Sequence, residues 1–372
     1  MATLPDDSVD LILTDPPYFK VKPSAAWDNA WADGDAFLAW LRGVALEWRR
    51  VLKPNGTLIC FAGCNPSTIR GASMAARVEV LLGDLFNVIA SAVWVKRDAQ
   101  GFHRGYGQHR PNLRAWFPET ERAIVCEQYT AENSRAKADG LLKGQVFEPL
   151  RQYLVGERRR SGLKGKAIQD GMHRLTGKRY VFERHAFSAS QWEMPTREQY
   201  EAFRSLCDQE GDPTGRPYCS REYEELRAEY EELRAEYEEL RAEYEELRRP
   251  FDAEAGAYFC DTWHYVTVGA HKGKHPCEKP ADMARDLVVQ CSRPGGVVLD
   301  TFCGSGAFLE AAAAAGRVAW GCDMQSRWAE ATRERVNGYA NVVAIRKIRG
   351  PGADAAPKRP QVDLLDWLRE AQ

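Results

Sequence analysis

A short motif near the N-terminus combines an acid, two prolines and an aromatic ring. Asp15-Pro16-Pro17-Tyr18 follows the apolar, β-branched run Val9 to Thr14. The prolines must end a strand or helix here, so the carboxylate and the Pro16 carbonyl become two acceptors with little freedom. The Tyr18 ring can stack on a planar base. These are the groups needed to bind an exocyclic amine; the alternative is a tight turn capped by Asp15, with Tyr18 in the core.

A second motif, Thr301-Phe302-Cys303-Gly304-Ser305-Gly306-Ala307, follows the apolar run 297–300 and begins an alanine-rich stretch. Glycines let the backbone approach a ligand closely, and a helix N-terminus offers free N–H groups. The next apolar run, 318–322, ends at Asp323, which is placed to accept hydrogen bonds from ribose hydroxyls. Some glycine loops bind no ligand and serve only to pack a strand tightly against a helix. Taken by itself, this glycine motif leaves that alternative open.

Strands and helices alternate on both sides of a long central region. Apolar, β-branched runs predict strands over 9–14, 57–61, 86–95, 297–300 and 318–322. Helical spacing or composition predicts helices over 35–52, 66–83, 281–291 and 307–315. Alternation of this kind indicates an α/β sheet.

The central region is basic. The window 143–185 holds 11 Lys or Arg residues against 4 Asp or Glu residues. Within it, 151–176 is interpreted as two or three short helices joined by Ser161-Gly162 and Gly171. This pattern of short helices and turns fits a helix-turn-helix that recognises nucleic acid. It fits equally well a packing of three helices that has no role in recognition.

A heptad, EYEELRA, is repeated four times over 222–249, with Tyr and Leu each recurring every seven residues. This spacing predicts a helix with an apolar seam. One hypothesis is a zipper between chains or a spacer for the basic region, and the other is a solvated helix packed on its own chain. Both stay open, because Tyr at every first seam position is not typical of a coiled coil.

The charges of the chain nearly cancel, with 51 Lys and Arg residues against 53 Asp and Glu residues. The repeats carry 12 Glu and 4 Arg residues over 222–248, so the remainder is basic. No apolar run is long enough to span a bilayer and the N-terminus does not resemble a leader, so we expect a cytoplasmic protein without a membrane partner. The 10 Cys residues include no C-x-x-C pair, which predicts reduced thiols and no metal site.

The motifs and their order resemble the β group of DNA amino-methyltransferases. In that family D-P-P-Y comes first, a variable target-recognition region follows, and H-P-x-x-K-P and F-x-G-x-G come last; here these last two are 275–280 and 302–306. The resemblance covers about 1–95 and 258–340. The stretch 190–200, with the repeats, also resembles a subgroup common in phages and prophages.

The resemblance implies a Rossmann-like α/β sheet of the S-adenosylmethionine-dependent methyltransferase type, with helices on both faces and a circularly permuted motif order. A mainly helical target-recognition region and the heptad helix are inserted into it. The predicted parts are a catalytic half (1–95), a basic recognition region (96–221), the heptad helix (222–249), a cofactor-binding half (250–345) and a tail (346–372).

The family also implies roles for single residues. Asp15 and the Pro16 carbonyl accept the amine hydrogens, within the rigid segment that includes Pro17, and Tyr18 stacks on the base. The cofactor is S-adenosylmethionine, and its implied site comprises Lys279, Pro280, Asp300, Phe302, Cys303, Gly304, Ser305, Gly306 and Asp323. Within this set Asp300 lies beside the methionine or sugar part, Asp323 holds the ribose, and Lys279 with Pro280 closes the methionine end.

The implied reaction is direct methyl transfer to adenine N6 in duplex DNA, with the base flipped out of the helix. Cytosine N4 is the alternative target. The alternative function is that of an inactive DNA-binding adapter that uses the heptads to oligomerise. Cytosine C5 chemistry needs a nucleophilic Cys, and we reject it because Cys277 lies inside H-P-x-x-K-P. The expected phosphate contacts are Arg158, Arg159, Arg160, Lys164, Lys166, Lys178 and Arg179, with Lys96, Arg97, Arg104 and Arg110 near the active-site loop.

The predicted partners are therefore duplex DNA and, through the heptad helix or the methyltransferase domain, a second copy of the chain. The expected setting is a bacterial nucleoid or a phage-infected cell, as in restriction-modification. One departure from the family concerns a strand and an acidic residue usually found upstream of 4–10. Either the start is truncated or another segment fills that edge of the sheet, and without that strand adenine-ring binding is in question.

Overall fold

The structure is a computed structural model that describes most of the chain. The described residues are 4–22, 24–63, 72–97, 116, 118–128, 139–178, 181–213, 215–269, 271 and 274–347. They form two compact units, of which the first combines Met1–Asn133 with Arg249–Gln372 and the second is Ser134–Arg248. No described helix has the length and apolarity needed to cross a membrane.

This division differs from the one expected from the sequence. Residues 96–133 belong to the first unit, because β4 lies within the sheet, whereas the basic region was expected to begin at 96. The heptad helix belongs to the same unit as the basic helices and is not a separate part.

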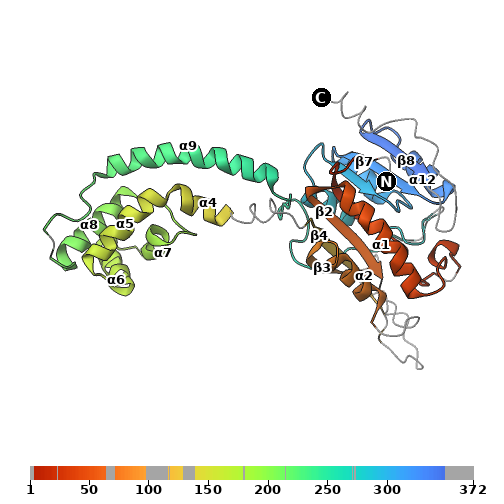
Figure 1. Cartoon of the computed structure of the whole chain (residues 1–372), viewed down its shortest axis with the longest axis horizontal. Helices are drawn as coiled ribbons and strands as arrows, with labels where there is room; N and C mark the ends of the chain where they lie inside the picture. The colour runs from red at the N-terminus through yellow and green to blue at the C-terminus, as the bar shows by residue number, and fades with distance from the viewer. Residues whose placement is uncertain are drawn as a thin grey trace. The chain divides into compact units, whose positions relative to one another are not determined.

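The first unit is built on an eight-stranded sheet with the order β5-β3-β4-β2-β1-β6-β7-β8 (Figure 1). Only β4 runs antiparallel to its neighbours β2 and β3; the other pairs are parallel. The strands are β1 (Val9–Thr14), β2 (Leu52–Gly63), β3 (Asn87–Val95), β4 (Thr120–Glu127), β5 (Thr262–Trp263), β6 (Val297–Asp300), β7 (Val318–Asp323) and β8 (Val342–Lys347).

Helices cover both faces of this sheet, so its central strands are buried on both sides. Alternate residues of β1 enter different cores: Ile12 packs in one cluster, and Leu11 and Leu13 pack in the other. The first cluster includes α1 (Gly34–Val51) and α2 (Met74–Gly83), which cross the same side of the strands in Figure 1. The second includes α10 (Ala281–Cys291), α11 (Ala307–Ala314) and α12 (Ser326–Arg335).

The expected elements are present with shifted bounds. The helix expected over 66–83 is described from Met74, and the rest of that range lies outside the described residues or precedes the helix. The strand expected over 57–61 begins at Leu52. The arrangement is the predicted Rossmann-like α/β sheet with helices on both faces.

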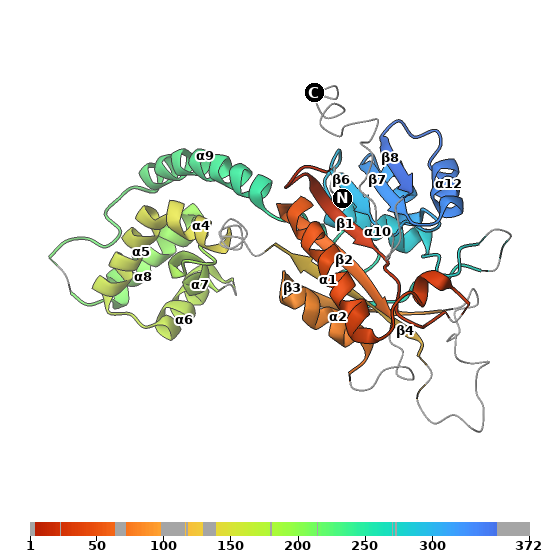
Figure 2. The same cartoon turned by 45° about the vertical axis from the view of Figure 1, so that its right-hand side comes forward.

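The sheet edge beside β7 is filled by β8, which comes after α12 in the chain (Figure 2). Asp323 at the end of β7 is opposite Lys347 of β8. β8 therefore occupies the edge of the sheet beside β7.

The second unit is helical and has its own core. Its helices are α4 (Asp139–Val146), α5 (Glu148–Ser161), α6 (Gly165–Thr176), α7 (Phe182–Phe187), α8 (Arg197–Glu210) and α9 (Tyr223–Leu247). The expected break after Ser161 is present, because Gly162 ends α5 with φ of 66°. The expected break at Gly171 is wrong. Gly171 lies inside α6, where a Cβ atom would approach Leu206 of α8 to 2.4 Å, so it permits close helix packing.

The first half of the heptad helix packs on its own chain. Leu226 is buried, and Tyr223, Tyr230, Leu233 and Tyr237 pack against the helical core. The Tyr230 ring stacks on Phe147 at a centroid distance of 5.1 Å. Figures 1 and 2 both draw α9 alongside α4 and α5. The apolar seam thus serves the fold of its own unit over these repeats, as the second hypothesis for the heptads predicted.

Candidate active site

The D-P-P-Y motif and the glycine loop meet because β1 and β6 are neighbours. The two strands are parallel, with Leu11 opposite Val298 and Ile12 opposite Leu299, so their carboxyl ends lie at the same edge of the sheet. Ligands of open α/β sheets bind outside this edge. The Thr14 hydroxyl donates to Asp300 Oδ1 at 2.8 Å and so joins the two strand ends directly.

The loop after Tyr18 is held in an unusual conformation. Phe19 and Lys20 have φ angles of 62° and 58°, in the left-handed region that non-glycine residues rarely adopt. The buried Asp28 carboxylate organises the loop: Oδ1 accepts from the Tyr18 N–H at 2.9 Å, and Oδ2 accepts from Val21 and Lys22 N–H groups, each at 2.7 Å. Burial raises the pKa of Asp28, while these hydrogen bonds lower it. No sequence signal separated Asp28 from an ordinary loop acid.

The end of β2 also shapes the site. A Cβ atom on Gly63 would lie 2.2 Å from the Tyr18 ring, so only glycine allows the ring to lie there. Gly63 was not predicted as a site residue, because a single glycine at a strand end has many ordinary explanations.

Asp300 ends β6 and is almost completely buried, with 2% of its surface exposed. Its Oδ1 accepts from the Thr14 hydroxyl and from the Phe302 N–H at 3.0 Å. Burial raises the pKa of Asp300 to about 7, although these hydrogen bonds favour the charged form. The acid therefore changes charge near neutral pH.

The glycine loop and the end of β7 face each other across hydrogen bonds. Asp323 Oδ2 accepts from the Gly304 N–H at 3.0 Å, and Oδ1 accepts from the Gln325 N–H at 2.7 Å. Gly304 and Gly306 have φ angles of 46° and 81°. A Cβ atom on Gly306 would approach Thr332 of α12 to 2.7 Å, so this glycine serves close packing.

One cavity of about 270 Å³ unites the two motifs. Predicted site residues on its wall are Asp15, Pro16, Pro17, Tyr18, Lys279, Asp300, Phe302, Cys303, Gly304, Ser305 and Asp323. Gly306 and Pro280 are not on the wall: Gly306 packs on Thr332, and Pro280 precedes α10. The sequence did not predict the cavity's aromatic residues Trp27, Trp40 and Trp328, which come from separate elements and follow no motif.

His275 and Cys277 of the H-P-x-x-K-P segment also line the cavity. The His275 ring packs against Trp27 and Trp328, with centroid distances of 6.3 and 4.6 Å. Burial lowers the pKa of His275 to about 4, so the ring is neutral at pH 7. Burial raises the pKa of Cys277 to about 11, which leaves a protonated thiol and agrees with its rejection as a nucleophile.

Lys279 lies in a buried cluster of charges that the sequence did not predict. Its ammonium contacts Asp15 Oδ2, and lies 3.3 Å from Glu121 Oε2 and 3.2 Å from the Tyr18 hydroxyl. Lys96 contacts the other Glu121 oxygen at 2.5 Å. Burial on its own would raise the pKa of Glu121, but Lys279 and Lys96 lower it to about 2. The Lys96 ammonium thus forms an internal ion pair, and its expected phosphate contact stays a prediction.

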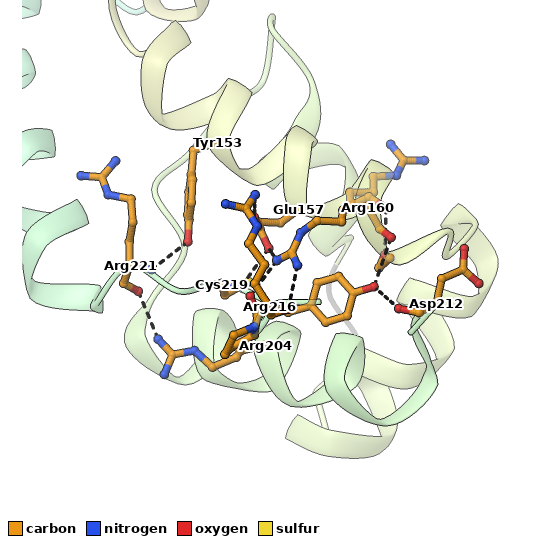
Figure 3. Close-up of polar contacts among 12 residues, drawn as sticks. Tyr153, Glu157, Arg160, Arg204, Asp212, Arg216, Cys219 and Arg221 are labelled. Atoms are coloured by element: carbon orange, nitrogen blue, oxygen red, sulfur yellow. Dashed lines mark hydrogen bonds and ion pairs between the residues drawn. The ribbon is translucent and has the colours of Figure 1, made fainter. Parts of the chain in front are cut away.

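Several cations of the helical unit also have internal partners. Arg158 pairs with Glu183 at 2.5 Å, and Lys178 pairs with Glu198 at 2.7 Å. Arg160 contacts the Glu157 carboxylate and donates to the Arg216 and Pro217 carbonyls (Figure 3). The contacts with these two carbonyls fix the segment between α8 and α9. In the structure Arg160 therefore stabilises its own unit.

The remaining predicted DNA contacts divide into two groups. Arg159, Lys164 and Lys166 are exposed around the turn between α5 and α6 and make no ion pair with any residue that the structure describes. Arg97 forms a backbone bridge with Val266. Arg179, Arg104 and Arg110 lie outside the described residues.

Several solved structures are similar to this one at low sequence identity. One is a putative DNA modification methylase of Thermus thermophilus crystallised with S-adenosyl-L-methionine, with 19% identity, 95% of each chain covered and a TM-score of 0.45. Another is the cytosine-N4-specific PvuII DNA methyltransferase, with 11% identity, 90% of this chain and 81% of that chain covered and a TM-score of 0.48. A third is the M1.HpyAVI–SAM complex, with 14% identity, 89% of each chain covered and a TM-score of 0.41.

The family itself is identified by a match that spans most of the chain. Residues 9–334 match the N6/N4 family model described as DNA methylase, and this range contains both motifs and the helical unit between them. The chain therefore belongs to the N6/N4 class of DNA methyltransferases, whose cofactor is S-adenosylmethionine.

Proposed function

We propose that this protein methylates the N6 amino group of adenine within a short sequence of duplex DNA. The observation that carries the proposal is that Asp15 and Pro16 line the same cavity as Gly304 and Asp323. An amine acceptor and a nucleotide-type loop thus face one space, as transfer of a methyl group to an amine requires.

The cavity fits the cofactor of the family. Gly304 brings the backbone to its wall, where a Cβ atom would lie 3.1 Å from the His275 ring and narrow the space. The Asp323 oxygens keep lone pairs for ribose hydroxyls beside their two backbone donors. Phe302, Trp40 and Trp328 offer faces for a purine ring. S-adenosylmethionine, when bound, supplies an electrophilic methyl group on a positively charged sulfur.

The chain's own residues would act by holding the amine. The Asp15 carboxylate and the Pro16 carbonyl accept its two hydrogens and direct the nitrogen lone pair at the methyl group. The amine nitrogen would take the methyl group from the cofactor's sulfur and would then have one proton to release. Asp15, which would hold the amine, would accept that proton; burial raises its pKa, although Lys279 opposes the shift. No covalent enzyme intermediate is needed, so positioning and electrostatics supply the rate.

A base inside a duplex cannot present its amine in line with the methyl group, so the base must be flipped into the site. Tyr18 would stack on it. Arg159, Lys164 and Lys166 are our candidates for phosphate contacts, because they are exposed and unpaired within the described chain. Replacing all three with Ala should flatten the salt dependence of DNA binding by about 0.9 per lost contact. Arg158→Ala is the matched control, because Glu183 already holds that guanidinium.

The choice of adenine depends on the first residue of D-P-P-Y. In the family that this motif resembles, Asp is more usual for adenine N6 and Ser for cytosine N4. Cytosine N4 remains the second candidate, since the family contains both specificities. The two bases present the same amino geometry to Asp15, so the mechanism would survive that change.

The decisive test is expression in a methylation-deficient bacterial host, followed by nucleoside mass spectrometry and modification-sensitive sequencing. N6-methyladenine at one motif is the expected result, and N4-methylcytosine would replace the proposed target. Asp15→Ala should abolish methylation while S-adenosylmethionine still raises the melting temperature. Soluble wild-type protein that neither methylates DNA nor is stabilised by the cofactor would favour the inactive adapter and refute the enzyme.

A further inference from the structure

The charges beside the catalytic motif alternate in sign. Lys96, Glu121, Lys279 and Asp15 form a continuous chain of ion pairs, with exposed side-chain fractions of 15%, 12%, 5% and 13%. Two cations and two anions balance within this buried cluster. Because unbalanced charges are costly in such surroundings, any movement of one group must be compensated by another.

Each oxygen of Asp15 already accepts one donor in this arrangement, and Lys279, the donor on Oδ2, lines the large cavity from which the amine would approach. Oδ1 accepts from the Tyr18 hydroxyl at 2.6 Å, and Oδ2 is in contact with the Lys279 ammonium. An incoming amine needs one of these oxygens as its acceptor. The ammonium is the stronger competitor, because a charged donor binds a carboxylate more tightly than a neutral amine does.

Glu121 is placed to receive that ammonium. Its Oε2 atom already lies 3.3 Å from Lys279 Nζ, so a small rotation of the lysine exchanges one carboxylate for the other. The Tyr18 hydroxyl can follow, because it lies 3.0 Å from Glu121 Oε2 as well. At the same time Lys96 holds the far oxygen of Glu121 in place.

The cavities define the direction of this movement. Lys279, Tyr18 and Cys277 line both the cavity of about 270 Å³ and a second one of about 110 Å³. Glu121 and Lys96 line only the smaller cavity. Moving the ammonium toward Glu121 therefore takes it away from the side where the glycine loop lies and leaves Asp15 Oδ2 open to that side.

We propose that Glu121 is a positioning residue that takes over the Lys279 ammonium when the target amine binds Asp15. The inference rests on the proposed methyl transfer and extends it. In the free protein Lys279 neutralises Asp15 and keeps the buried site balanced. During the reaction Glu121, fixed by Lys96, keeps the same ammonium buried and paired, so Asp15 is released without moving a charge into water.

The test is Glu121→Gln, which keeps the shape of the side chain and removes its charge. Among the described residues, Asp15 is then the only carboxylate that pairs with Lys279, and we expect the single-turnover methylation rate to fall about 10–100-fold. The dissociation constant for S-adenosylmethionine should stay unchanged. The matched control is Glu127→Gln on the same strand, where Glu127 is also buried but pairs with Arg249 at 3.4 Å; it should methylate at the wild-type rate.

The double variant Glu121→Gln/Lys279→Met gives a result that a merely structural role would not produce. At saturating S-adenosylmethionine, which offsets any loss of cofactor affinity at Lys279, removing the competing ammonium should restore about tenfold of the rate lost in Glu121→Gln. Such a coupling is within the usual range for residues in contact. A Glu121→Gln rate equal to wild type overturns the inference. So does a double variant no faster than the single one, or an equal loss in Glu127→Gln.

The wild-type protein separates this inference from the proposed function. If wild-type protein transfers no methyl group to DNA, the proposed function fails and the inference fails with it. If wild type methylates and Glu121→Gln is equally fast, only the inference fails. Melting temperatures of all four proteins, recorded in parallel, identify a variant whose rate falls because it unfolds.

Discussion

Replacing Asp300 with Asn should change how the stability of the protein depends on pH. The side chain is 2% exposed, and its burial raises the folded-state pKa to about 7 from an ordinary value of 3.8. Asn keeps an oxygen for the Thr14 hydroxyl and the Phe302 N–H but carries no charge at any pH. The two proteins therefore differ mainly in one titration.

The sign of the effect follows from proton binding. Between pH 3.8 and 7 the folded state keeps the Asp300 proton while the unfolded state loses it, so wild-type stability falls as the pH rises through this window. The shift is 7 − 3.8, or about 3 pKa units, and at 1.36 kcal/mol per unit the full loss is about 4 kcal/mol. The loss is complete above pH 7, and it is absent in Asp300→Asn.

The assay is thermal unfolding of both proteins without cofactor, from pH 5 to pH 8.5. The melting temperature of Asp300→Asn minus that of wild type should increase with pH and level off above pH 7. Between pH 5 and pH 7 the assay samples about 2 of the 3 pKa units, or about 3 kcal/mol. At about 2–4 °C per kcal/mol, the melting-temperature difference should change by about 5–10 °C. A difference that stays constant with pH would refute the argument, because it would mean that Asp300 titrates alike in the folded and unfolded states.

Three further predictions concern single side chains. Asp28→Ala removes the acceptor of three backbone N–H groups. Each donor left unsatisfied costs about 1–3 kcal/mol of folding free energy, so the loop should relax. Methylation should then fall by more than tenfold in a radiolabel assay. Gly63→Val should displace the Tyr18 ring and reduce the methylation rate while cofactor binding, measured by calorimetry, persists; normal turnover would contradict the close approach. Leu226→Ala should destabilise the helical unit by about 2–5 kcal/mol in denaturant titrations. Leu247→Ala, at the half-exposed equivalent position of the fourth repeat, should change stability by less than about 0.5 kcal/mol.

The helical seam bears on oligomeric state as well. Over its first repeats α9 uses Leu226 and Tyr230 to cover its own core, so these side chains are not available to a second chain. The later seam residue Leu247 is 50% exposed. A homodimer through the heptads would therefore have to use the end of α9 near Leu247, and sedimentation of Leu247→Glu against wild type tests this.

Local sequence determined the elements and the two motifs. Asp15-Pro16-Pro17-Tyr18 and the loop at Gly304 each follow a strand directly, because prolines or glycines end the preceding apolar run at a fixed residue. Heptad spacing in the same way determined a helix over 223–247. Each of these inferences needs only neighbouring residues.

Tertiary structure decided which distant residues meet. Thr14 and Asp300 are 286 positions apart and bond only because β1 and β6 pair. Glu121 reaches Lys279 because β4 enters the sheet antiparallel to β2, which no local pattern specified; the only sequence signal was an acid next to an apolar strand.

The cations of the basic region also show that local sequence does not specify which distant residues pair. Composition gave their number, but only the fold distinguished Arg160, committed to Glu157, from the exposed Lys166. A sequence specifies which side chains can carry a charge and which prefer helix or strand. Whether a charge is paired, buried or free depends on long-range contacts, and those contacts set its pKa and its availability to a ligand.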